Sequence, residues 1–462
     1  MDCLVKFSTP QLEKIHSGKV RESFRIDKNS RMIVVTDRIS CFDKVLKTPI
    51  PYKGAVLNGI SNFWFEKTSQ IIDNHFIKCV DNNITIVKEA SPIRIEMIVR
   101  GYLAGSMWRN YQNGKMTFSG IKISDGMKKN EKFIKPIVTP TTKEESDREI
   151  SPAEIIKEGL TTKDVYEQME EISLELFQFG TDILAEKNLI LVDAKYEFGL
   201  INGYLILIDE IHTPDSSRFW WADIYNKDQQ NVQPIDKEYV RQWLLKNRTD
   251  GKFPDSLPNE IVKETSARYL ELYKMVTGEV LLCNENEDMM KRIYNNLVKE
   301  QIIKDGYIAI IMGSISDLEH CNKIKKCIEK YDIMTDLRVV SAHKNGEQII
   351  KMVEEYNSSI EPGSVIAVAG KSNGLGGALA ANLNIPVISC PPFKDNLDIL
   401  LNINSSLMMP SKVPSATVIN PESSALAALR SLNLHRLRNI FSKEIMQVKE
   451  SLKEDDMKIR KR

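Results

Sequence analysis

The chain has 462 residues, of which 42% are hydrophobic and 27% charged, a composition that suits two or three soluble globular domains. Lys+Arg and Asp+Glu balance at 63 each, so no global field favours nucleic acid or an anionic membrane, and an anionic ligand needs a local site. The absence of a membrane-length apolar run, of a signal-peptide pattern and of metal spacing among the seven cysteines predicts a cytoplasmic protein with reduced thiols.

The first half of the chain mixes strands with helices. Strands are predicted at "RMIVV" and "LILVDAKYEFGL", and a helix at "YEQMEEISLELFQFG". The turn 201–203 joins the second of these strands to a short apolar strand in a hairpin. Alternate residues of a strand share a face, so Asp193, Lys195 and Glu197 would lie together, with Glu197 near Asp209 or Glu210. Such carboxylates suit Mg²⁺ and a polyphosphate, and a salt-bridged sheet face is an equal alternative.

Several other segments carry groups that bind oxyanions. The stretch "DSSR", residues 215–218, offers hydroxyls, an arginine fork and turn amides. Gly18 and Lys19 of "SGKVRESF" are predicted in a turn between strands, but Val20 stands where a Walker A loop requires Ser or Thr. The segments "TDRISCFD" and "VRGYLAGSMWR" add further arginines and hydroxyls, each of which alone is more often a surface residue than a ligand.

Together these segments resemble SAICAR synthetase, the purine-pathway ligase, across nearly all of residues 10–280. The matching pieces are "GKVRESF", "TDRISCFD", "GAVLNGISNFWF", "VRGYLAGSMW", "PTTKEESD", "LVDAKYEFG", "DEIHTPDSSRFW" and "LPNEIVKETSARYLELY". The resemblance implies an α+β, ATP-grasp-like domain over residues 1–290 that uses ATP to join L-aspartate to the carboxylate of carboxyaminoimidazole ribonucleotide (CAIR).

The same resemblance implies roles for individual residues. Lys19 would bind the ATP phosphates, and Glu197 and Asp209 would hold Mg²⁺. The substrate phosphate would be contacted by Arg100, Ser106 and Arg218. Asp215 and Lys195 would be catalytic at the reacting end. The chemistry agrees, because a carboxylate becomes an acyl donor only after phosphorylation, which needs a metal ion and fixed cations.

The second half shows a different pattern. A polar stretch at 283–305 offers little core and is predicted to contain the domain boundary, with a linker at 291–305. Apolar strands then alternate with helices, which predicts a three-layer α/β domain with a parallel sheet over 306–440. A charged amphipathic helix that packs on a neighbour is predicted at 441–462.

Polar residues follow three of these apolar strands. Their predicted places, at the carboxyl ends of the strands, are where open α/β sheets build their sites. They are Ser314, Asp317, Ser341, His343, Lys344 and Ser372. A lone Asp such as Asp317 is by default a helix cap, and a lone His is more often structural. The "GKS" at 370–372 is not a P-loop, because Val365 stands at the position of its first glycine.

This half resembles aminoimidazole ribonucleotide (AIR) carboxylase over residues 306–434, through "MGSISD", "VVSAHK", "AVAGKSNGLGG", "PVISCPP" and "PSATV". Lys344 and the "GKSNGLGG" loop are similar to the form that uses CO₂ directly, so neither ATP nor biotin is expected at this site. The resemblance implies that Ser314, Asp317 and Ser341 contact the substrate. It also implies that His343 shuttles the ring proton and that Lys344 and Ser372 lie at the CO₂ site.

The two resemblances concern consecutive reactions, which predicts a bifunctional enzyme of purine biosynthesis. The expected partners are small molecules: AIR, CO₂, CAIR, L-aspartate and ATP. Apolar helices such as "GGALAANL" predict a homo-oligomer formed through the second domain, and the resemblance suggests an octamer. The alternative is a nucleotide-binding regulatory protein whose catalytic groups have decayed, and the intact acidic and basic residues argue against it.

Overall fold

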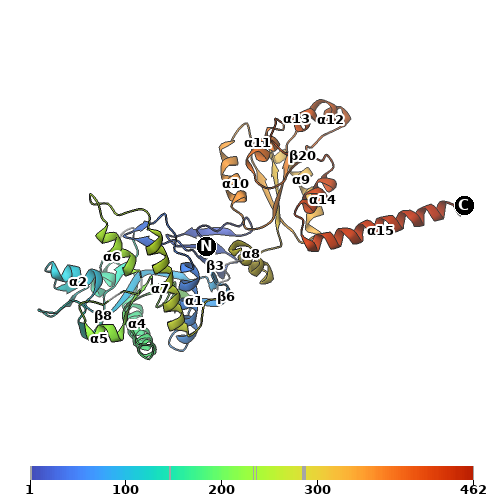
Figure 1. Ribbon diagram of the computed structural model, residues 1–462. Coiled ribbons are helices and arrows are strands. Elements are labelled where there is room, and N and C mark those ends of the chain that lie inside the picture. The colour runs from blue at the N-terminus through green and yellow to red at the C-terminus, as the bar shows by residue number, and fades with distance from the viewer. Residues whose placement is uncertain (1–2, 145–146, 233, 236, 283–287, 461–462) are drawn as a thin grey trace. The chain divides into compact units, whose positions relative to one another are not determined.

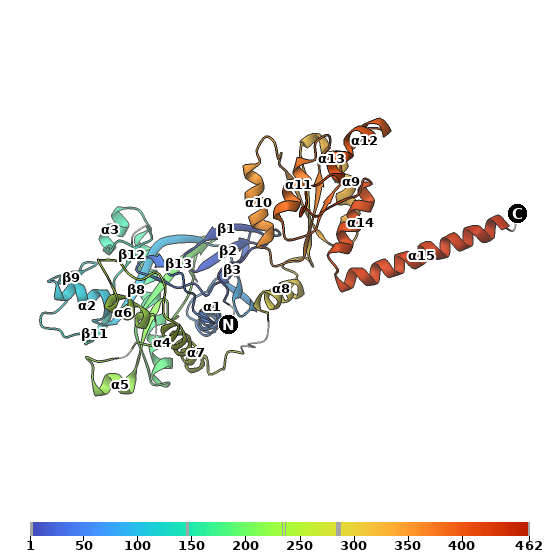
Figure 2. The ribbon, with the colours of Figure 1, turned by 45° about the horizontal axis from the view of Figure 1, so that its top comes forward.

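The computed structural model describes residues 3–144, 147–232, 234–235, 237–282 and 288–460. The chain divides into two compact units, shown in Figures 1 and 2. Unit 1 holds Met1–Lys6 and Lys14–Ile293, and unit 2 holds Phe7–Glu13 and Tyr294–Arg462. The predicted α/β class is confirmed. Residues 283–287 of the predicted boundary segment and 461–462 of the predicted last helix lie outside the described residues.

Unit 1 is built on two larger sheets. The first has the order β1-β2-β3-β7-β6. Its strands are β1 (Glu13–Ser17), β2 (Arg21–Arg25), β3 (Ser30–Val35), β7 (Ile84–Lys88) and β6 (Phe76–Asp81). The second has the order β11-β8-β13-β14, with β12 paired to β8 and β15 paired to β13, all antiparallel. Its strands are β11 (Lys132–Val138), β8 (Ser91–Tyr102), β13 (Leu189–Ile201), β14 (Tyr204–Ile208), β12 (Thr141–Thr142) and β15 (Ser217–Trp221).

Helices and short strands complete unit 1. The helices are α1 (Lys53–Lys67), α2 (Gly105–Gln112), α3 (Pro152–Lys157), α4 (Lys163–Ala185), α5 (Ala222–Lys227), α6 (Glu238–Lys246) and α7 (Asn259–Thr277). The short strands are β4 (Ser40–Cys41), β5 (Lys44–Val45), β9 (Thr117–Phe118) and β10 (Ile121–Lys122). Helix α8 (Met289–Lys299) contains the point at which unit 1 gives way to unit 2.

The predicted hairpin is confirmed, because β13 and β14 pair antiparallel around the turn at 202–203. The alternation of β13 gives its two faces different roles. Ala194, Tyr196 and Phe198 are fully buried in the core that α4 covers. Lys195 and Glu197 point to the opposite face, as the period of two in a strand requires. The register sets Glu197 opposite Ile208, the residue before Asp209.

Unit 2 is a parallel sheet covered on both faces, as predicted. The strand order is β17-β16-β18-β19-β20, and every pair is parallel. The strands are β16 (Tyr307–Met312), β17 (Met334–Val339), β18 (Gly363–Val368), β19 (Val387–Ser389) and β20 (Ser415–Thr417). The helices are η1 (Ile315–Asp317), α9 (Leu318–Glu329), α10 (Glu347–Asn357), α11 (Gly374–Asn382), α12 (Asn396–Asn402), α13 (Asn404–Leu407), α14 (Pro421–Ser431) and α15 (His435–Arg460).

Alternate residues of the central strand β16 feed two separate cores. Ile308 and Ile310 pack with α9 and α14 on one face, and Ala309 and Ile311 pack with α10 and α11 on the other. A strand buried on both faces must be apolar throughout, which is why "YIAIIM" shows no alternation of apolar and polar residues. No helix in the described ranges has both the length and the apolar character needed to cross a bilayer.

Two expectations about the second half are corrected. The stretch 283–305 does contribute to a core, because Ile293 and Leu297 of α8 are fully buried, and the predicted linker begins inside this helix. The last helix starts at His435, not 441. Its apolar stripe stays open, because Ile445, Val448 and Leu452 are 43%, 61% and 64% exposed and the described residues do not cover them.

Unit 2 also contains an N-terminal segment, Phe7–Glu13. Thr9 donates to the Glu361 carboxylate, which is only 4% exposed. Gln11 and Lys304 exchange hydrogen bonds of 2.8 and 2.9 Å, and Ile360 N donates to Ser8 O at 3.2 Å. A buried carboxylate is costly unless it is hydrogen-bonded, so this segment satisfies a group that the rest of unit 2 buries.

Candidate active sites

Two arginines and a helix N-terminus in unit 1 form a candidate phosphate cradle. Arg100 on β8 and Arg218 on β15 lie on either side of Asp193, with which both form ion pairs. The N-terminus of α2 lies beside them without a side-chain cap. Gly105 there has a φ of 59°, and a Cβ at this position would overlap the Arg218 guanidinium. Two guanidinium groups beside an uncapped helix N-terminus are suited to a dianion.

The exposed Ser106 is the second residue of α2, so the structure brings the predicted phosphate contacts Arg100, Ser106 and Arg218 to one place. The strand register explains this convergence. Arg100 and Arg218 face Asp193 from the neighbouring strands on its two sides. The Asp193 carboxylate pairs with both guanidinium groups and so holds them side by side.

Glu197 and Asp209 form the second feature of unit 1, a coupled carboxylate pair. Burial and then the Asp209 charge raise the pKa of Glu197 to about 8, although Lys143 opposes this by pairing with it. Burial would raise the pKa of Asp209 too, but Arg21, then Lys143 and a hydrogen bond from Glu197, hold it below its usual value. Two carboxyl groups this close repel each other when both are charged, so a cation is favoured beside them.

This pair fits a Mg²⁺ ion that takes its remaining ligands from a nucleotide. Mg²⁺ is usually bound by one or two carboxylates together with water and phosphate oxygens. Within the described ranges, no group of three or more His, Cys, Asp or Glu side chains could hold a metal ion alone. Asp209 has a left-handed backbone, with a φ of 68°, which turns the chain sharply after β14 and sets its carboxylate beside Glu197.

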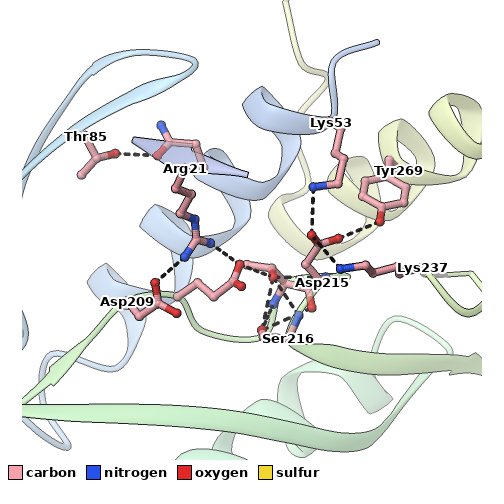
Figure 3. A network of polar contacts seen from close by, with 11 residues as sticks. Arg21, Lys53, Thr85, Asp209, Asp215, Ser216, Lys237 and Tyr269 are labelled. Carbon is pink, nitrogen blue, oxygen red and sulfur yellow. Dashed lines mark hydrogen bonds and ion pairs between the residues drawn. The ribbon is translucent and has the colours of Figure 1, made fainter. Parts of the chain in front are cut away.

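Asp215 is the centre of a buried network that includes residues far away in sequence. Lys53 at the start of α1 donates to Oδ2 at 2.9 Å, Lys237 donates to the same atom at 3.4 Å, and Tyr269 of α7 donates to Oδ1 at 2.9 Å (Figure 3). The side chains of Lys53 and Asp215 are 0% and 6% exposed. Burial raises the pKa of Asp215, but Lys237, Lys53 and Tyr269 together outweigh it and hold this pKa well below its usual range.

Lys195 lies close to two carboxylates, those of Glu96 and Glu197. Its ammonium donates to Glu96 at 2.7 Å, and Glu96 lies opposite Glu197 in the pairing of β8 with β13.

Lys19, in the turn between β1 and β2, pairs with the exposed Asp43 at 2.7 Å. The turn confirms the expectation for Gly18 and Lys19, and its closing bond runs from Gly18 N to Arg21 O at 2.8 Å.

The loop that carries Asp209 and Asp215 is anchored in the core by His212. Its Nε2 atom lies 2.6 Å from the Tyr196 hydroxyl, and its ring packs edge-to-face against Trp64, with 4.7 Å between the ring centroids. Burial lowers the pKa of His212 to about 3, so the ring is neutral. Gly180 leaves room for it, because a Cβ there would overlap the imidazole. Tyr196 lies between Lys195 and Glu197 on β13, so this anchor ties the loop to the strand that carries both.

In unit 2, the predicted residues follow three adjacent parallel strands. Ser314 and Asp317 follow β16, Ser341 to Lys344 follow β17, and Ser372 follows β18. Since β17 and β18 flank β16 in parallel register, the three strand ends lie side by side. The connection from β16 to β17 runs through α9 on one face of the sheet, and the connection from β17 to β18 runs through α10 on the other, which is the arrangement that places ligand sites in open α/β folds.

Hydrogen bonds and close packing hold the loops at this edge of the sheet. Ser316 donates to Ser314 at 3.0 Å and to Asp317 at 3.4 Å, and burial raises the pKa of Asp317. His343 is exposed and lies against Gly374, where a Cβ would come 3.0 Å from its ring.

Asn373 is the buried support of the glycine loop. Its amide donates to Ser389 at 2.9 Å and to Ser406 at 3.1 Å, and its oxygen caps α11. This side chain keeps the neighbouring Ser372 at the rim. The structure therefore gathers the predicted residues along one edge, with Lys344 and Ser372 exposed on it.

Several residues of these sites escaped the sequence interpretation, namely Arg21, Lys53, Lys143, Lys237 and Tyr269, and so did the buried, supporting role of Asn373. Arg21 stood inside a motif that was already singled out, but nothing in the motif indicates that it pairs with Asp209. Lys53, Lys237 and Tyr269 reach Asp215 from separate helical segments, and no local pattern signals such a contact. For Asn373, its place just before the helix at 374–382 is a capping signal that could have been used.

Comparison with known proteins finds a matching family for each half of the chain. The family model for SAICAR synthetase matches residues 14–255, and that for AIR carboxylase matches residues 307–455. Phosphoribosylaminoimidazole-succinocarboxamide synthase of Bacteroides thetaiotaomicron is 44% identical over 301 residues, which are 63% of this chain and 96% of that protein.

Two solved structures are also similar. SAICAR synthase from Saccharomyces cerevisiae, complexed with SAICAR, is 32% identical, with a TM-score of 0.55, over 61% of this chain and 100% of that one. Treponema denticola PurE is 33% identical, with a TM-score of 0.31, over 33% of this chain and 98% of that one.

Proposed function

The chain belongs to the SAICAR synthetase family and carries an AIR carboxylase domain after it, and from this premise we propose how its residues divide two consecutive steps of purine biosynthesis. Unit 2 carboxylates AIR to CAIR, and unit 1 joins CAIR to L-aspartate with ATP, forming SAICAR, ADP and phosphate. The order of the domains along the chain is the reverse of the order of the reactions. A decayed regulatory protein is not favoured.

The phosphate cradle is the observation that carries the ligase assignment. The N-terminus of α2 lies beside Asp193 together with Arg100 and Arg218. The ion pairs of the two arginines with Asp193 do not by themselves require a helix N-terminus without a side-chain cap. They would hold the ribose phosphate of CAIR, with Ser106 as a further donor. From there the substrate's carboxylate extends toward Lys195, which would steady its negative charge during phosphorylation.

Glu197 and Asp209 would hold Mg²⁺, and Lys19 would bind the ATP phosphates. The bound ion would offset the charge that develops on the transferred phosphoryl group. The raised pKa of Glu197 supports this role, because burial and the nearby Asp209 charge disfavour a bare second anion there, and a divalent cation would offset that charge. Phosphoryl transfer then gives an acyl phosphate, in which the former carboxylate carbon accepts a nucleophile.

Asp215 has the properties of a fixed anion rather than of a base. A carboxylate held by two lysines and a tyrosine, with its pKa well below the usual range, is a poor proton acceptor. We assign it the task of orienting the amine of L-aspartate through a hydrogen bond. The amine nitrogen attacks the acyl carbon, the carbon–oxygen bond to phosphate breaks, and the leaving phosphate takes the proton.

In unit 2, Ser314, Asp317 and Ser341 would bind AIR. The ring carbon of this enamine attacks CO₂ held by Lys344 and Ser372, and the displaced ring proton passes to His343. An imidazole is suited to cycle a proton near neutral pH. Lys344 is a point charge, not an arginine fork, which favours direct capture of CO₂ over the handling of a detached carbamate. Neither ATP nor biotin is needed for this step.

The surface of unit 2 favours assembly into a homo-oligomer, for which the family resemblance suggests eight subunits. The segment from α12 through α13 exposes large apolar side chains that a lone subunit would leave in water. Their exposed fractions are 64% for Leu397, 72% for Leu400, 71% for Leu401, 60% for Leu407 and 79% for Met408. Apolar patches of this kind mark protein contacts. The assembled enzyme would work in the cytoplasm, where its substrates are made.

One experiment tests the whole proposal. The purified chain is given AIR and bicarbonate, then ATP, Mg²⁺ and L-aspartate, and the products are separated by chromatography. CAIR should accumulate in the first mixture and SAICAR in the second, with one ADP released for each SAICAR. A protein that binds the nucleotides but forms neither product would disprove the bifunctional assignment.

A further inference from the structure

Arg21 occupies a place in the ligase site where a metal ion would otherwise be expected. It lies on β2, and its guanidinium pairs with Asp209 through Nη1 and with Glu210 through Nη2. Figure 3 shows Arg21 reaching Asp209. Its side chain is only 16% exposed. The Nε atom is buried and has no hydrogen-bond partner among the described residues, so one N–H donor of the guanidinium has no acceptor.

This ion pair and a bound Mg²⁺ make incompatible demands on Asp209. A guanidinium keeps its proton at every accessible pH, so Arg21 cannot make room by becoming neutral. Two cations on one carboxylate repel each other strongly at the dielectric of a partly buried site. Lys143 already pairs with Glu197, the other member of the carboxylate pair. A divalent ion that binds here must therefore displace a resident cation or bind against its repulsion.

The position of Arg21 in the chain indicates where its charge is needed next. Its carbonyl accepts the hydrogen bond from Gly18 N that closes the turn carrying Lys19, so both cations come from one hairpin. Lys19 is the residue assigned above to the ATP phosphates. A guanidinium released from Asp209 has the planar fork that binds phosphate oxygens at two points.

We propose that Arg21 is a displaceable counter-ion of the magnesium site. It neutralises Asp209 and Glu210 while the site is empty, leaves Asp209 when the metal ion binds, and then contacts the nucleotide phosphates. The inference rests on the proposed magnesium ligands Glu197 and Asp209. The competing interpretation is a static scaffold in which Arg21 only holds the two carboxylates in place.

The two interpretations predict opposite changes in metal affinity when Arg21 is replaced. Mn²⁺ serves as the probe, and its binding to the full chain without nucleotide is followed by the loss of the free-ion electron paramagnetic resonance signal. For Arg21→Gln, displacement predicts Mn²⁺ affinity about tenfold tighter, the size of a typical coupling between two ligands. A static scaffold predicts weaker binding. Arg31→Gln is the matched control, because Arg31 lies on β3, the strand next to β2 in the same sheet, and pairs there with Glu89 instead of with a proposed metal ligand.

A second measurement tests the contact with phosphate. With saturating Mg²⁺, calorimetry should show ADP binding about tenfold weaker in Arg21→Gln than in the wild type, and unchanged in Arg31→Gln. Tighter Mn²⁺ binding with unchanged ADP affinity would overturn the phosphate contact. Unchanged or weaker Mn²⁺ binding in a folded variant would overturn the displacement.

Two outcomes separate this inference from the function beneath it. If the wild type binds no Mn²⁺ with or without ADP, the magnesium ligands proposed above are wrong and the inference falls with them. If Arg21→Gln fails to give a native circular dichroism spectrum, Arg21→Lys decides. Lysine keeps the charge but cannot span two carboxylates, so Mn²⁺ affinity should still rise, by less than tenfold. No rise in Arg21→Lys counts against displacement.

Discussion

Replacing Lys53 by Met tests the buried network around Asp215. The ammonium and the carboxylate lie 2.9 Å apart, and their side chains are 0% and 6% exposed. At an effective dielectric of 20, charges at this separation attract by about 6 kcal/mol. Lys237 and Tyr269 remain on Asp215 in the variant and offset part of this loss. We therefore expect a cost of about 3 kcal/mol in the free energy of unfolding, the lower end for breaking a buried pair.

Tryptophan fluorescence during urea unfolding is the assay, because all five tryptophans of the sequence lie in unit 1. Lys115→Met is the control, since the exposed pair of Lys115 with Glu149 should contribute less than about 1 kcal/mol. Combining Lys53→Met with Asp215→Asn should recover much of the loss, because the buried carboxylate no longer carries a charge, although Lys237, which is 13% exposed, loses its ion pair with Asp215. A Lys53→Met protein as stable as the control would refute this account of the network.

The sign of the pH dependence gives a further check. The pKa of Asp215 is held below its usual value in the folded state, so its stabilising contribution is present above the unfolded pKa and is lost as pH falls through the folded pKa. Removing Lys53 raises the folded pKa. The deficit of Lys53→Met should be largest at neutral pH and should narrow as the pH is lowered, because a protonated Asp215 needs no cation.

Four further outcomes are expected. Glu197→Gln should abolish ligation but leave AIR carboxylation near the wild-type rate, measured by product chromatography, and normal ligation would remove this residue from the metal site. His343→Asn should abolish uptake of labelled bicarbonate into CAIR and spare the ligase; rapid turnover of N5-carboxy-AIR by the wild type, without label uptake, would show that CO₂ is not its carbon source. A fragment of residues 294–462 should gain about 1–3 kcal/mol of stability in urea unfolding when a peptide of residues 7–13 is added, and no gain would argue against that segment's role. Leu400→Glu should reduce the mass measured by sedimentation from that of an oligomer, and a monomeric wild type would refute assembly.

Much of the site could be predicted because its information is local. The alternation of β13 and the two-residue turn after it determine which side chains share a face and which residues meet across the hairpin. Glu197 and Asp209 are twelve positions apart, and the register brings them close by setting Glu197 opposite Ile208, the residue before Asp209. In unit 2, the polar residues that end each apolar strand must lie at one edge, because parallel strands carry their carboxyl ends to the same side.

The sequence by itself therefore determined the family, the fold class of each half and the residues that occupy the strand ends and the hairpin. Only the tertiary structure decided what those residues do to one another. Lys53 and Tyr269 reach Asp215 across separations of 162 and 54 residues, and Arg21 reaches Asp209 across 188. The physical reason is that periodicity and turns act over a few residues, whereas the charge on a buried group depends on every neighbour that packing brings to it. That packing holds the pKa of Asp215 well below its usual range, so this carboxylate is a poor proton acceptor.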